Sequence, residues 1–304
     1  MGRKQPNIKQ QLQNRIDGLT RFGEKKVKDD PTNPNRAEGI HSVKTCESYR
    51  ATARLFGDYL KQEHVRNIDD ITREHVQGFM HTRENLSPYT YSRELSAINK
   101  MLDTRYTVRE FDMRGRSHHN IQNNRGLSQC DTSQAERNRQ ALEFAHACGM
   151  RRSSIDRVTP ADFIRNSSGQ CIGVHLLEKG GKERDAIILQ QYRDRITLQV
   201  DNAIQQTGLT TPFLKEPDHN ANPHYERGEY ARELYADLMQ AGQAGYDYYD
   251  GMRDRFINDE YYSKACERYK DEYVRGYERD TMAEVSQNLG HNRIDVVLYH
   301  YLLR

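Results

Sequence analysis

The 304-residue sequence lacks long apolar runs and has few cysteines. No stretch approaches the roughly 20 apolar residues that a membrane-spanning helix needs, and residues 1–6 lack the apolar core of a signal peptide. The five cysteines are odd in number and never form a C-x-x-C pair, which argues against a disulfide framework and against a zinc site. We therefore expect a cytoplasmic protein with reduced thiols and no membrane partner.

Charge is abundant instead. Asp, Glu, Lys and Arg make up 30% of the residues, and the mean hydropathy is −1.00. The length is sufficient for two domains with cores of their own. Although the net charge is only +2, residues 1–40 carry nine basic residues against five acidic ones, which predicts a basic N-terminal arm that neutralises phosphates. An arm that reads DNA, a contact between subunits and a solubilising tail remain alternatives.

Apolar spacing predicts a small helical domain over residues 41–107. Residues 42–63 place apolar side chains three and four positions apart, as in an amphipathic helix. Thr72 starts a second helix, and Ser87 followed by Pro88 starts a third, with proline at the first helical position.

The remainder of the chain predicts a mainly α fold with a small β-sheet. Residues 108–133 are basic and poor in apolar side chains, which indicates a linker, and a helix follows to residue 148. The runs 171–177 and 185–189 read as a hairpin around a glycine turn. A tyrosine-rich stretch at about 243–280 predicts a helical insertion, which either contacts DNA or another subunit or packs on its own domain.

Six residues then occur in a recognisable order over residues 134–304. An arginine follows Gly-Met, a lysine precedes Gly-Gly, a His-x-x-Arg motif comes next, and a histidine is followed ten residues later by a tyrosine. These residues are Arg151, Lys179, His224, Arg227, His291 and Tyr301. The order resembles that of the tyrosine recombinases, the phage and mobile-element integrases that share a catalytic domain with type IB topoisomerases. The resemblance implies a SAM-like core-binding DNA domain over 41–107 and a catalytic domain over 134–304.

The resemblance also implies a role for each of these residues. Arg151 and Arg227 would bind the non-bridging phosphate oxygens through their planar forks. Lys179 would protonate the leaving 5′ oxygen, and the two histidines would bind the phosphate or move a proton. Tyr301 would attack the phosphorus and leave a 3′-phosphotyrosine. Such chemistry relies on positioning and on positive charge, so no cofactor or metal is expected.

Three neighbouring residues compete for these assignments. Arg152 adjoins the first arginine, but the family's Gly-Leu-Arg pattern fits Arg151. Lys182 lies after the Gly-Gly turn, whereas the family's lysine precedes it. Tyr299 lies only eight residues after His291, and the family places its nucleophile nine or ten residues after the histidine. The sequence also departs from the family at Ser154, where an acidic residue is common, and at Gly228, where a histidine is common.

The implied function is that of an integrase of a mobile element, acting as a homotetramer on two double-stranded DNA sites with accessory DNA-bending or directionality proteins. A topoisomerase-like enzyme or resolvase and a non-catalytic DNA-binding protein of the same fold are the alternatives. The basic side chains expected to face DNA are Lys44, Arg50, Arg83, Arg93, Lys100, Arg114, Arg116 and Arg125.

Overall fold

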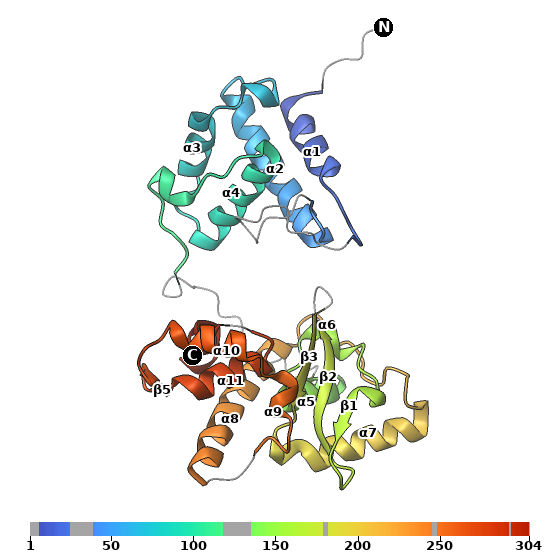
Figure 1. The fold of residues 1–304 in the computed structure, drawn as a ribbon. Coiled ribbons are helices and arrows are strands. Elements are labelled where there is room, and N and C mark those ends of the chain that lie inside the picture. Colours follow the sequence, from blue (N-terminus) through green and yellow to red (C-terminus); the bar gives the residue numbers. More distant parts are fainter. Residues whose placement is uncertain are drawn as a thin grey trace. The chain divides into compact units, whose positions relative to one another are not determined.

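The computed structural model describes residues 6–24, 39–117, 135–178, 182–244, 248–291 and 293–303. The chain divides into two compact units, residues 1–122 and residues 123–304 (Figure 1). Within the described part of the chain, no helix combines the length and the apolar character needed to cross a membrane.

The first unit is helical. Its elements are α1 (Ile8–Gly18), α2 (Val43–Gln62), α3 (Arg73–His81) and α4 (Pro88–Leu102), with short 3-10 helices at Ile68–Asp70 and Val108–Phe111. The predicted start of α4 is confirmed, because the backbone N–H of Thr90 donates to Oγ of Ser87 at 3.3 Å and Pro88 follows the cap. At the start of α3, the backbone N–H of Thr72 donates to Nδ1 of His75 at 3.0 Å.

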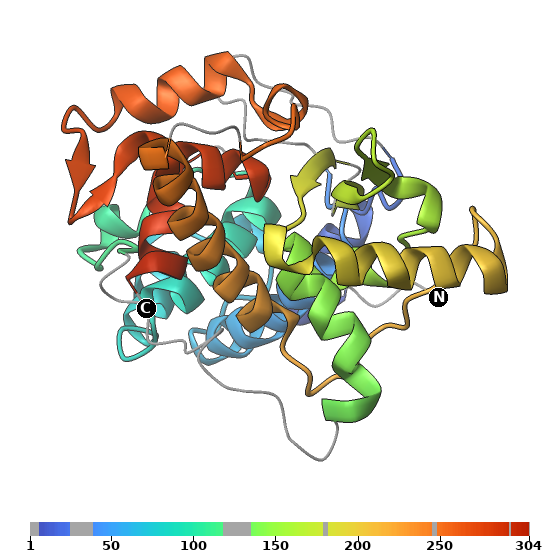
Figure 2. The same ribbon diagram turned by 90° about the horizontal axis from the view of Figure 1, so that it is seen from below.

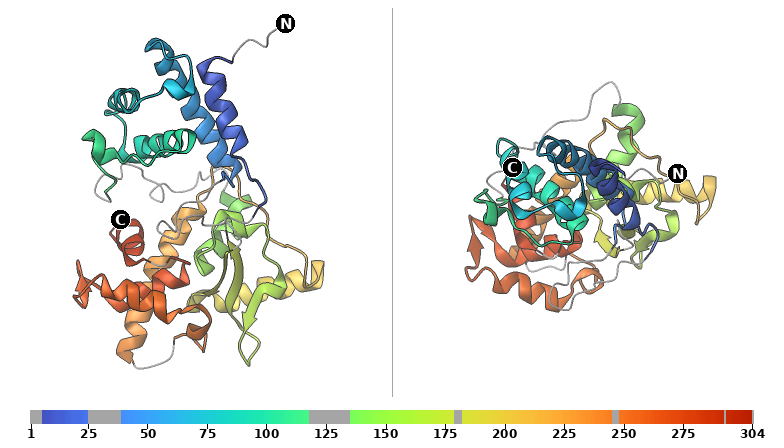
Figure 3. Two further views of the ribbon diagram at one scale, coloured as in Figure 1. Left: turned by 45° about the horizontal axis from the view of Figure 1, so that its top comes forward. Right: turned by 90° about the horizontal axis from the view of Figure 1, so that it is seen from above.

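Helix α1 corrects the prediction of an arm over residues 1–40. It lies beside α2 (Figure 3), and its Leu12 and Ile16 are fully buried in the core of the first unit. Gly57 permits the close approach, because a Cβ there would lie 2.7 Å from Cγ of Lys9. The four-residue spacing that starts at Ile8 was a helical signal, which the surrounding positive charge obscured. Residues 1–5 and 25–38 of the predicted arm lie outside the described residues.

The predicted linker over 108–133 also begins later than expected. Phe111 is fully buried in the core of the first unit and Met113 is nearly so. The hydroxyl of Tyr91 donates to the carbonyl oxygen of Arg114, which ties the chain beyond Met113 to α4. Residues 118–134, which include Arg125, lie outside the described residues.

The second unit combines helices with two small antiparallel sheets. Strands β1 (Phe163–Arg165), β2 (Cys171–Glu178) and β3 (Lys182–Ile187) form a three-stranded sheet in the order β1-β2-β3. The helices are α5 (Ala135–Cys148), α6 (Arg152–Ile155), α7 (Arg193–Thr207), α8 (Pro223–Ala244), α9 (Arg253–Phe256), α10 (Asp259–Glu267), α11 (Arg279–Asn288) and α12 (Ile294–Val297), and a π-helix covers Leu298–Leu302. Strands β4 (Tyr273–Val274) and β5 (Tyr277–Glu278) form a short ribbon.

The three-stranded sheet lies between two apolar cores. Because side chains alternate along a strand, Ala186 and Ile188 enter the core that contains α5 and α7, whereas Ile187 and Leu189 enter the core that contains α8, α11 and α12. Helix α7 contacts β2, and α11 contacts β3 (Figure 2). Burial on both faces explains the continuous apolar run at the end of the predicted hairpin.

The predicted insertion over about 243–280 is only partly helical. The segment contains two short helices and the β4–β5 ribbon. Positive φ angles at Asp250 and Gly251, and at Arg275 and Gly276, turn the chain before and after α9 and α10. Several of its tyrosines pack on the core around α8 and α11, namely Tyr248, Tyr249, Tyr262, Tyr269 and Tyr277. Residues 245–247 lie outside the described residues.

Candidate active site

The ends of two helices bring the candidate residues together. Helix α5 ends before Gly149, and α11 ends at Asn288 with Leu289 as its cap. Gly149 has a φ of +61°, and a Cβ there would lie 2.5 Å from the ring of Tyr230, so no larger residue fits this turn. The backbone carbonyl oxygens at these helix ends accept no hydrogen bond from their own helices, and they carry partial negative charge that attracts cations. They accept hydrogen bonds from three arginines of the second unit.

Arg227 is the most deeply placed of the predicted residues. It extends from the first turns of α8, is 1% exposed, and donates to the carbonyl oxygens of Gly149 and Leu289. Its Nη2 lies 3.5 Å from Nε2 of His291. Burial, together with the charge of Arg184, lowers the pKa of Arg227 to about 10, so the guanidinium stays charged at neutral pH.

Arg151 lies at the edge of the same group. It is the N-cap of α6, and its Nη1 pairs with Oε2 of Glu178 at 2.6 Å. Its Nη2 lies 3.5 Å from the carbonyl oxygen of Leu289. The side chain is 31% exposed, whereas that of Glu178 is 2% exposed, so Arg151 is the more accessible partner of the pair.

His291 follows a turn that requires glycine. The N–H of His291 donates to the carbonyl of Ser286 at 2.7 Å, and that of Gly290 donates to Gln287 at 2.7 Å, which is the Schellman arrangement. Gly290 has a φ of +68°. Burial, together with the charges of Arg227, Arg151 and Arg184, lowers the pKa of His291 to about 2, so the imidazole is neutral.

Tyr301 reaches this histidine from the π-helix. Its hydroxyl lies 3.5 Å from Nε2 of His291, and its ring lies 5.9 Å from the ring of His224, which is exposed at the start of α8. Nη1 of Arg232 donates to the backbone carbonyl of Tyr301 at 2.7 Å and fixes this end of the chain. The structure therefore brings Tyr301 together with His291, Arg227 and His224.

The competing residues lie elsewhere. The ring of Tyr299 faces the guanidinium of Arg275 at 5.4 Å. Arg152 donates to the carbonyl oxygens of Pro217, Asp218 and Ala221, and so supports the loop before α8. Lys182 is the first residue of β3, and its backbone lies opposite that of Glu178 in the register of the hairpin. Lys179 lies outside the described residues.

Comparisons with known proteins bear on the fold of the chain. Residues 36–106 match the family model of the phage integrase N-terminal SAM-like domain. The XerH site-specific recombinase, solved in a post-cleavage complex with a palindromic difH substrate, matches with a TM-score of 0.50 and 13% identity over 97% of this chain and 91% of that chain. The Tn1549 transposon integrase in complex with transposon right end DNA matches with a TM-score of 0.41 and 11% identity over 97% and 95%. No curated protein sequence matches.

The chain has the fold of the tyrosine recombinases. The predicted resemblance and the predicted fold class, mainly α with small sheets and a SAM-like domain, are thereby confirmed.

Two of the basic residues predicted to face DNA in the SAM-like domain are held by acids. Arg50 pairs with Asp17 at 2.7 Å, and Arg83 pairs with the buried carboxylate of Glu94 at 2.9 Å. Lys100 is half-buried, whereas Lys44, Arg93, Arg114 and Arg116 are exposed, as is Arg50. Arg116 stacks on the ring of Tyr89 at 5.5 Å. Lys44, Arg93, Arg114 and Arg116 are the stronger candidates for phosphate contacts, because Arg50 and Arg83 would first have to leave their carboxylate partners.

Sequence reasoning missed two charged residues of the candidate site. Glu178 and Arg184 are both buried and are paired at 2.9 Å. The period-two pattern of β2 was a signal, because it places Glu178 on the same face as the buried Leu176. Ser154, which stands where the family often has an acid, donates to the carbonyl of Leu177 at 3.4 Å, so the carboxylate beside Arg151 comes from β2.

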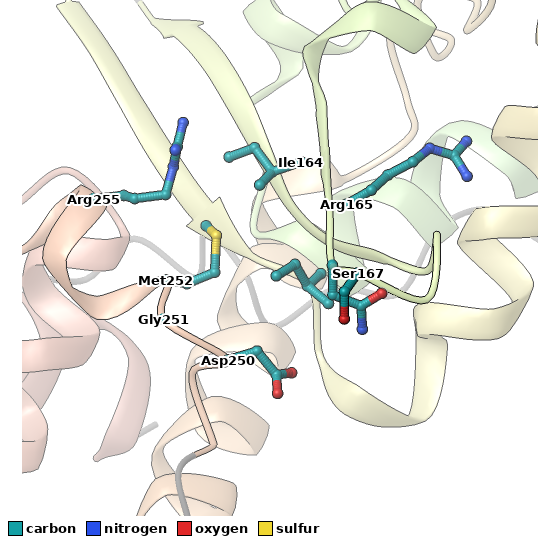
Figure 4. A pocket seen from close by; sticks show the side chains of 9 residues that line it. Ile164, Arg165, Ser167, Asp250, Gly251, Met252 and Arg255 are labelled. Carbon is teal, nitrogen blue, oxygen red and sulfur yellow. The ribbon is translucent and has the colours of Figure 1, made fainter.

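A pocket of about 440 Å³ lies away from these residues (Figure 4). Its walls come from β1 and the segment after it, from β2, and from α9 and the turn before it. The charged side chains in its walls are already paired: Asp250 with Arg193, Arg165 with Asp201, and Arg255 with Asp185. It contains none of the candidate catalytic residues, and we assign it no role in the chemistry.

Proposed function

We propose that this protein is a site-specific recombinase that cuts and rejoins DNA through a 3′-phosphotyrosine on Tyr301, and that it integrates and excises a mobile element. One observation carries the proposal: the Tyr301 hydroxyl and the Arg227 guanidinium both lie 3.5 Å from Nε2 of His291. The SAM-like match supports it, as does the match to XerH, a site-specific recombinase solved with its cleaved difH substrate.

The histidine is suited to receive the proton of the nucleophile. Attack by the Tyr301 oxygen on phosphorus requires loss of the phenolic proton, and Nε2 of His291 is the acceptor within reach. The low pKa of His291, about 2, leaves this nitrogen unprotonated. A bound phosphodiester brings a negative charge that offsets the neighbouring arginines, which raises the pKa of His291 and makes it a better acceptor when DNA is bound.

The arginines complete the transfer. Arg151 and Arg227 stabilise the charge that builds on the non-bridging oxygens. The bond from phosphorus to the Tyr301 oxygen forms, and the bond to the 5′ oxygen breaks. Lys179 donates a proton to that oxygen, and His224 adds a contact to the phosphate. Reversal of these steps with a different 5′ hydroxyl rejoins the strand.

Strand exchange between two duplexes requires one tyrosine for each of four strands. We therefore propose a homotetramer on two DNA sites, with accessory proteins that bend the DNA or set the direction. The exposed basic residues of the SAM-like domain supply sequence-independent phosphate contacts that hold it on the duplex.

The first experiment incubates the wild type, Tyr301→Phe and Tyr299→Phe with nicked duplexes from the ends of the element that encodes the protein. We expect a denaturant-resistant protein–DNA adduct with the wild type and Tyr299→Phe, and none with Tyr301→Phe. Tyr299→Phe is the matched control, because it removes the same atom two residues away. Thermal unfolding of each variant checks that the fold is retained.

The possible outcomes separate the proposed function from its alternatives. Loss of the adduct only in Tyr299→Phe would move the nucleophile by two residues. Tight binding without an adduct would identify a non-catalytic DNA-binding protein. Relaxation of plasmids of any sequence would identify a topoisomerase.

A further inference from the structure

A single buried carboxylate joins two of the three arginines at the helix ends. Oε2 of Glu178 lies 2.6 Å from Nη1 of Arg151, and its Oε1 accepts from Nε of Arg184 at 2.9 Å. The Glu178 side chain is 2% exposed and that of Arg184 is 6% exposed. A carboxylate buried between two guanidinium groups is held in one orientation, because both of its oxygens have charged partners.

Arg184 is fixed from every side. Its Nη1 donates to the carbonyl of Asn288 at 2.6 Å, and its Nη2 donates to that of Gly149 at 2.9 Å. Gly290 makes room for it, because a Cβ at that position would lie 2.9 Å from Cδ of Arg184. All three nitrogens of its fork are engaged, so Arg184 holds Glu178 in place and does not offer a donor to a substrate.

Of the two arginines that Glu178 joins, Arg151 is the one whose side chain can still contact a substrate. Its strong contact is the one to Glu178, whereas the 3.5 Å contact to Leu289 is long for a hydrogen bond. A partly exposed arginine has many rotamers, and fixing one of them costs conformational entropy. The ion pair between Nη1 of Arg151 and Glu178 fixes one rotamer of Arg151 before a phosphate binds.

We propose that Glu178 and Arg184 act together as a positioning pair that presents Arg151 to the scissile phosphate. The proposal rests on the proposed function. Glu178 acts as a fixed anion and not as a proton donor or acceptor. Burial alone would raise the pKa of Glu178, but the charge of Arg184 and the hydrogen bond from Arg151 outweigh it, and the pKa lies below its ordinary value. The carboxylate is therefore ionised throughout the physiological range.

The test compares cleavage of an ordinary nicked duplex with cleavage of one that carries a methylphosphonate at the scissile position. The methyl group removes the negative charge that an arginine must stabilise, so loss of a positioned arginine slows the charged substrate more than the neutral one. Displacement of a catalytic group by about 1 Å can cost about 100-fold in rate. We expect Glu178→Gln to slow phosphodiester cleavage by about that factor, and to slow methylphosphonate cleavage much less.

Two comparisons calibrate this readout. Arg151→Ala shows the substrate preference that follows from complete loss of the arginine. Glu143→Gln is the matched control, because Glu143 of α5 is another largely buried carboxylate, which pairs with Arg195 and with no candidate catalytic residue. Glu178→Gln should share the substrate preference of Arg151→Ala, and Glu143→Gln should cleave both substrates as the wild type does.

A double variant separates positioning from folding. Glu178→Gln leaves Arg184 buried without a counter-charge, which destabilises a protein more than removal of both partners does. Glu178→Gln combined with Arg184→Met removes the buried charge of Arg184 as well, yet Arg151 still lacks its support. A folded double variant that slows both substrates equally, or neither, would overturn the proposal while the proposed function stands. Absence of an adduct with the wild type would instead remove the proposed function itself, and the positioning role with it.

Discussion

The two units bury different kinds of side chain. Among the described residues of the first unit, the buried polar side chains are Thr52 and Glu94. The described part of the second unit buries eleven, and three of them are arginines: Arg184, Arg193 and Arg227. Burying a charge costs free energy even when the charge is paired. Apolar packing therefore accounts for the first unit. In the second unit, Arg184 and Arg227 lie with Arg151 at the ends of α5 and α11, and this cluster suggests a purpose of the buried charge beyond stability.

The largest expected effect comes from Arg227. Arg227→Lys keeps the charge but loses the planar fork that reaches both Gly149 and Leu289, and lysine cannot replace such a paired contact. We expect the rate of adduct formation to fall by about 100-fold or more, the loss typical for one group that stabilises transition-state charge. Rapid-quench kinetics with saturating protein measure the rate directly.

Arg193→Lys is the control for this substitution. Arg193 is equally buried, but it pairs with Asp250 and donates to the carbonyl of Tyr248, outside the candidate site. It should lower stability and leave the cleavage rate of the folded protein unchanged. Equal losses of rate in the two variants would mean that buried arginines of the second unit serve only stability.

The first unit could largely be predicted from the sequence. The apolar spacing of residues 42–63 and the caps at Thr72 and Ser87 each indicate one helix, because propensity, capping and burial agree there. Helix α1 was missed because Ile8, Leu12 and Ile16 are its only apolar side chains, and polar residues fill the positions between them. Such a short pattern becomes decisive only once α2 and α4 provide a surface to cover.

The candidate site was predictable as a set of residues and not as a network. The order from Arg151 to Tyr301 was visible in the sequence, but the contacts that fix these residues are mostly to backbone carbonyls, which no residue identity reveals. Glu178 and Arg184 flank the predicted Lys179 and its Gly-Gly turn in the sequence, yet their burial depends on α11 packing over β3. The turns at Gly251 and Gly276 likewise could not be recognised from the sequence, because they depend on how the tyrosine-rich segment packs on its domain.

A second prediction tests the buried charge of the first unit. Both oxygens of Glu94 accept from Arg83, at 2.9 and 3.0 Å. Arg83→Met leaves the carboxylate buried without a partner, and we expect the free energy of unfolding to fall by about 3 kcal/mol. Arg83→Met combined with Glu94→Leu should recover most of that loss, because apolar residues replace a buried pair well. Urea unfolding of the full chain measures both. A double variant as unstable as the single one would show that apolar residues cannot replace the pair of Arg83 and Glu94.

The smallest expected effect concerns His146 of α5, whose ring nitrogens pair with Glu226 at 3.0 Å and Glu233 at 2.9 Å of α8. Burial lowers the pKa of His146, but the hydrogen bonds to the two carboxylates outweigh it and raise the pKa above the ordinary 6.5. The folded protein thus holds this proton more tightly than the unfolded chain does. Its contribution to stability, on the order of 1 kcal/mol, is complete below about pH 6.5 and is lost as the pH rises through the raised value.

Urea unfolding between pH 5 and pH 9 should therefore show that the free energy of unfolding of the wild type declines as the pH rises. The decline should be smaller in His146→Gln, because the glutamine amide does not titrate. If the decline in His146→Gln is instead as large as in the wild type, the contacts of His146 with Glu226 and Glu233 do not carry the pH dependence of stability.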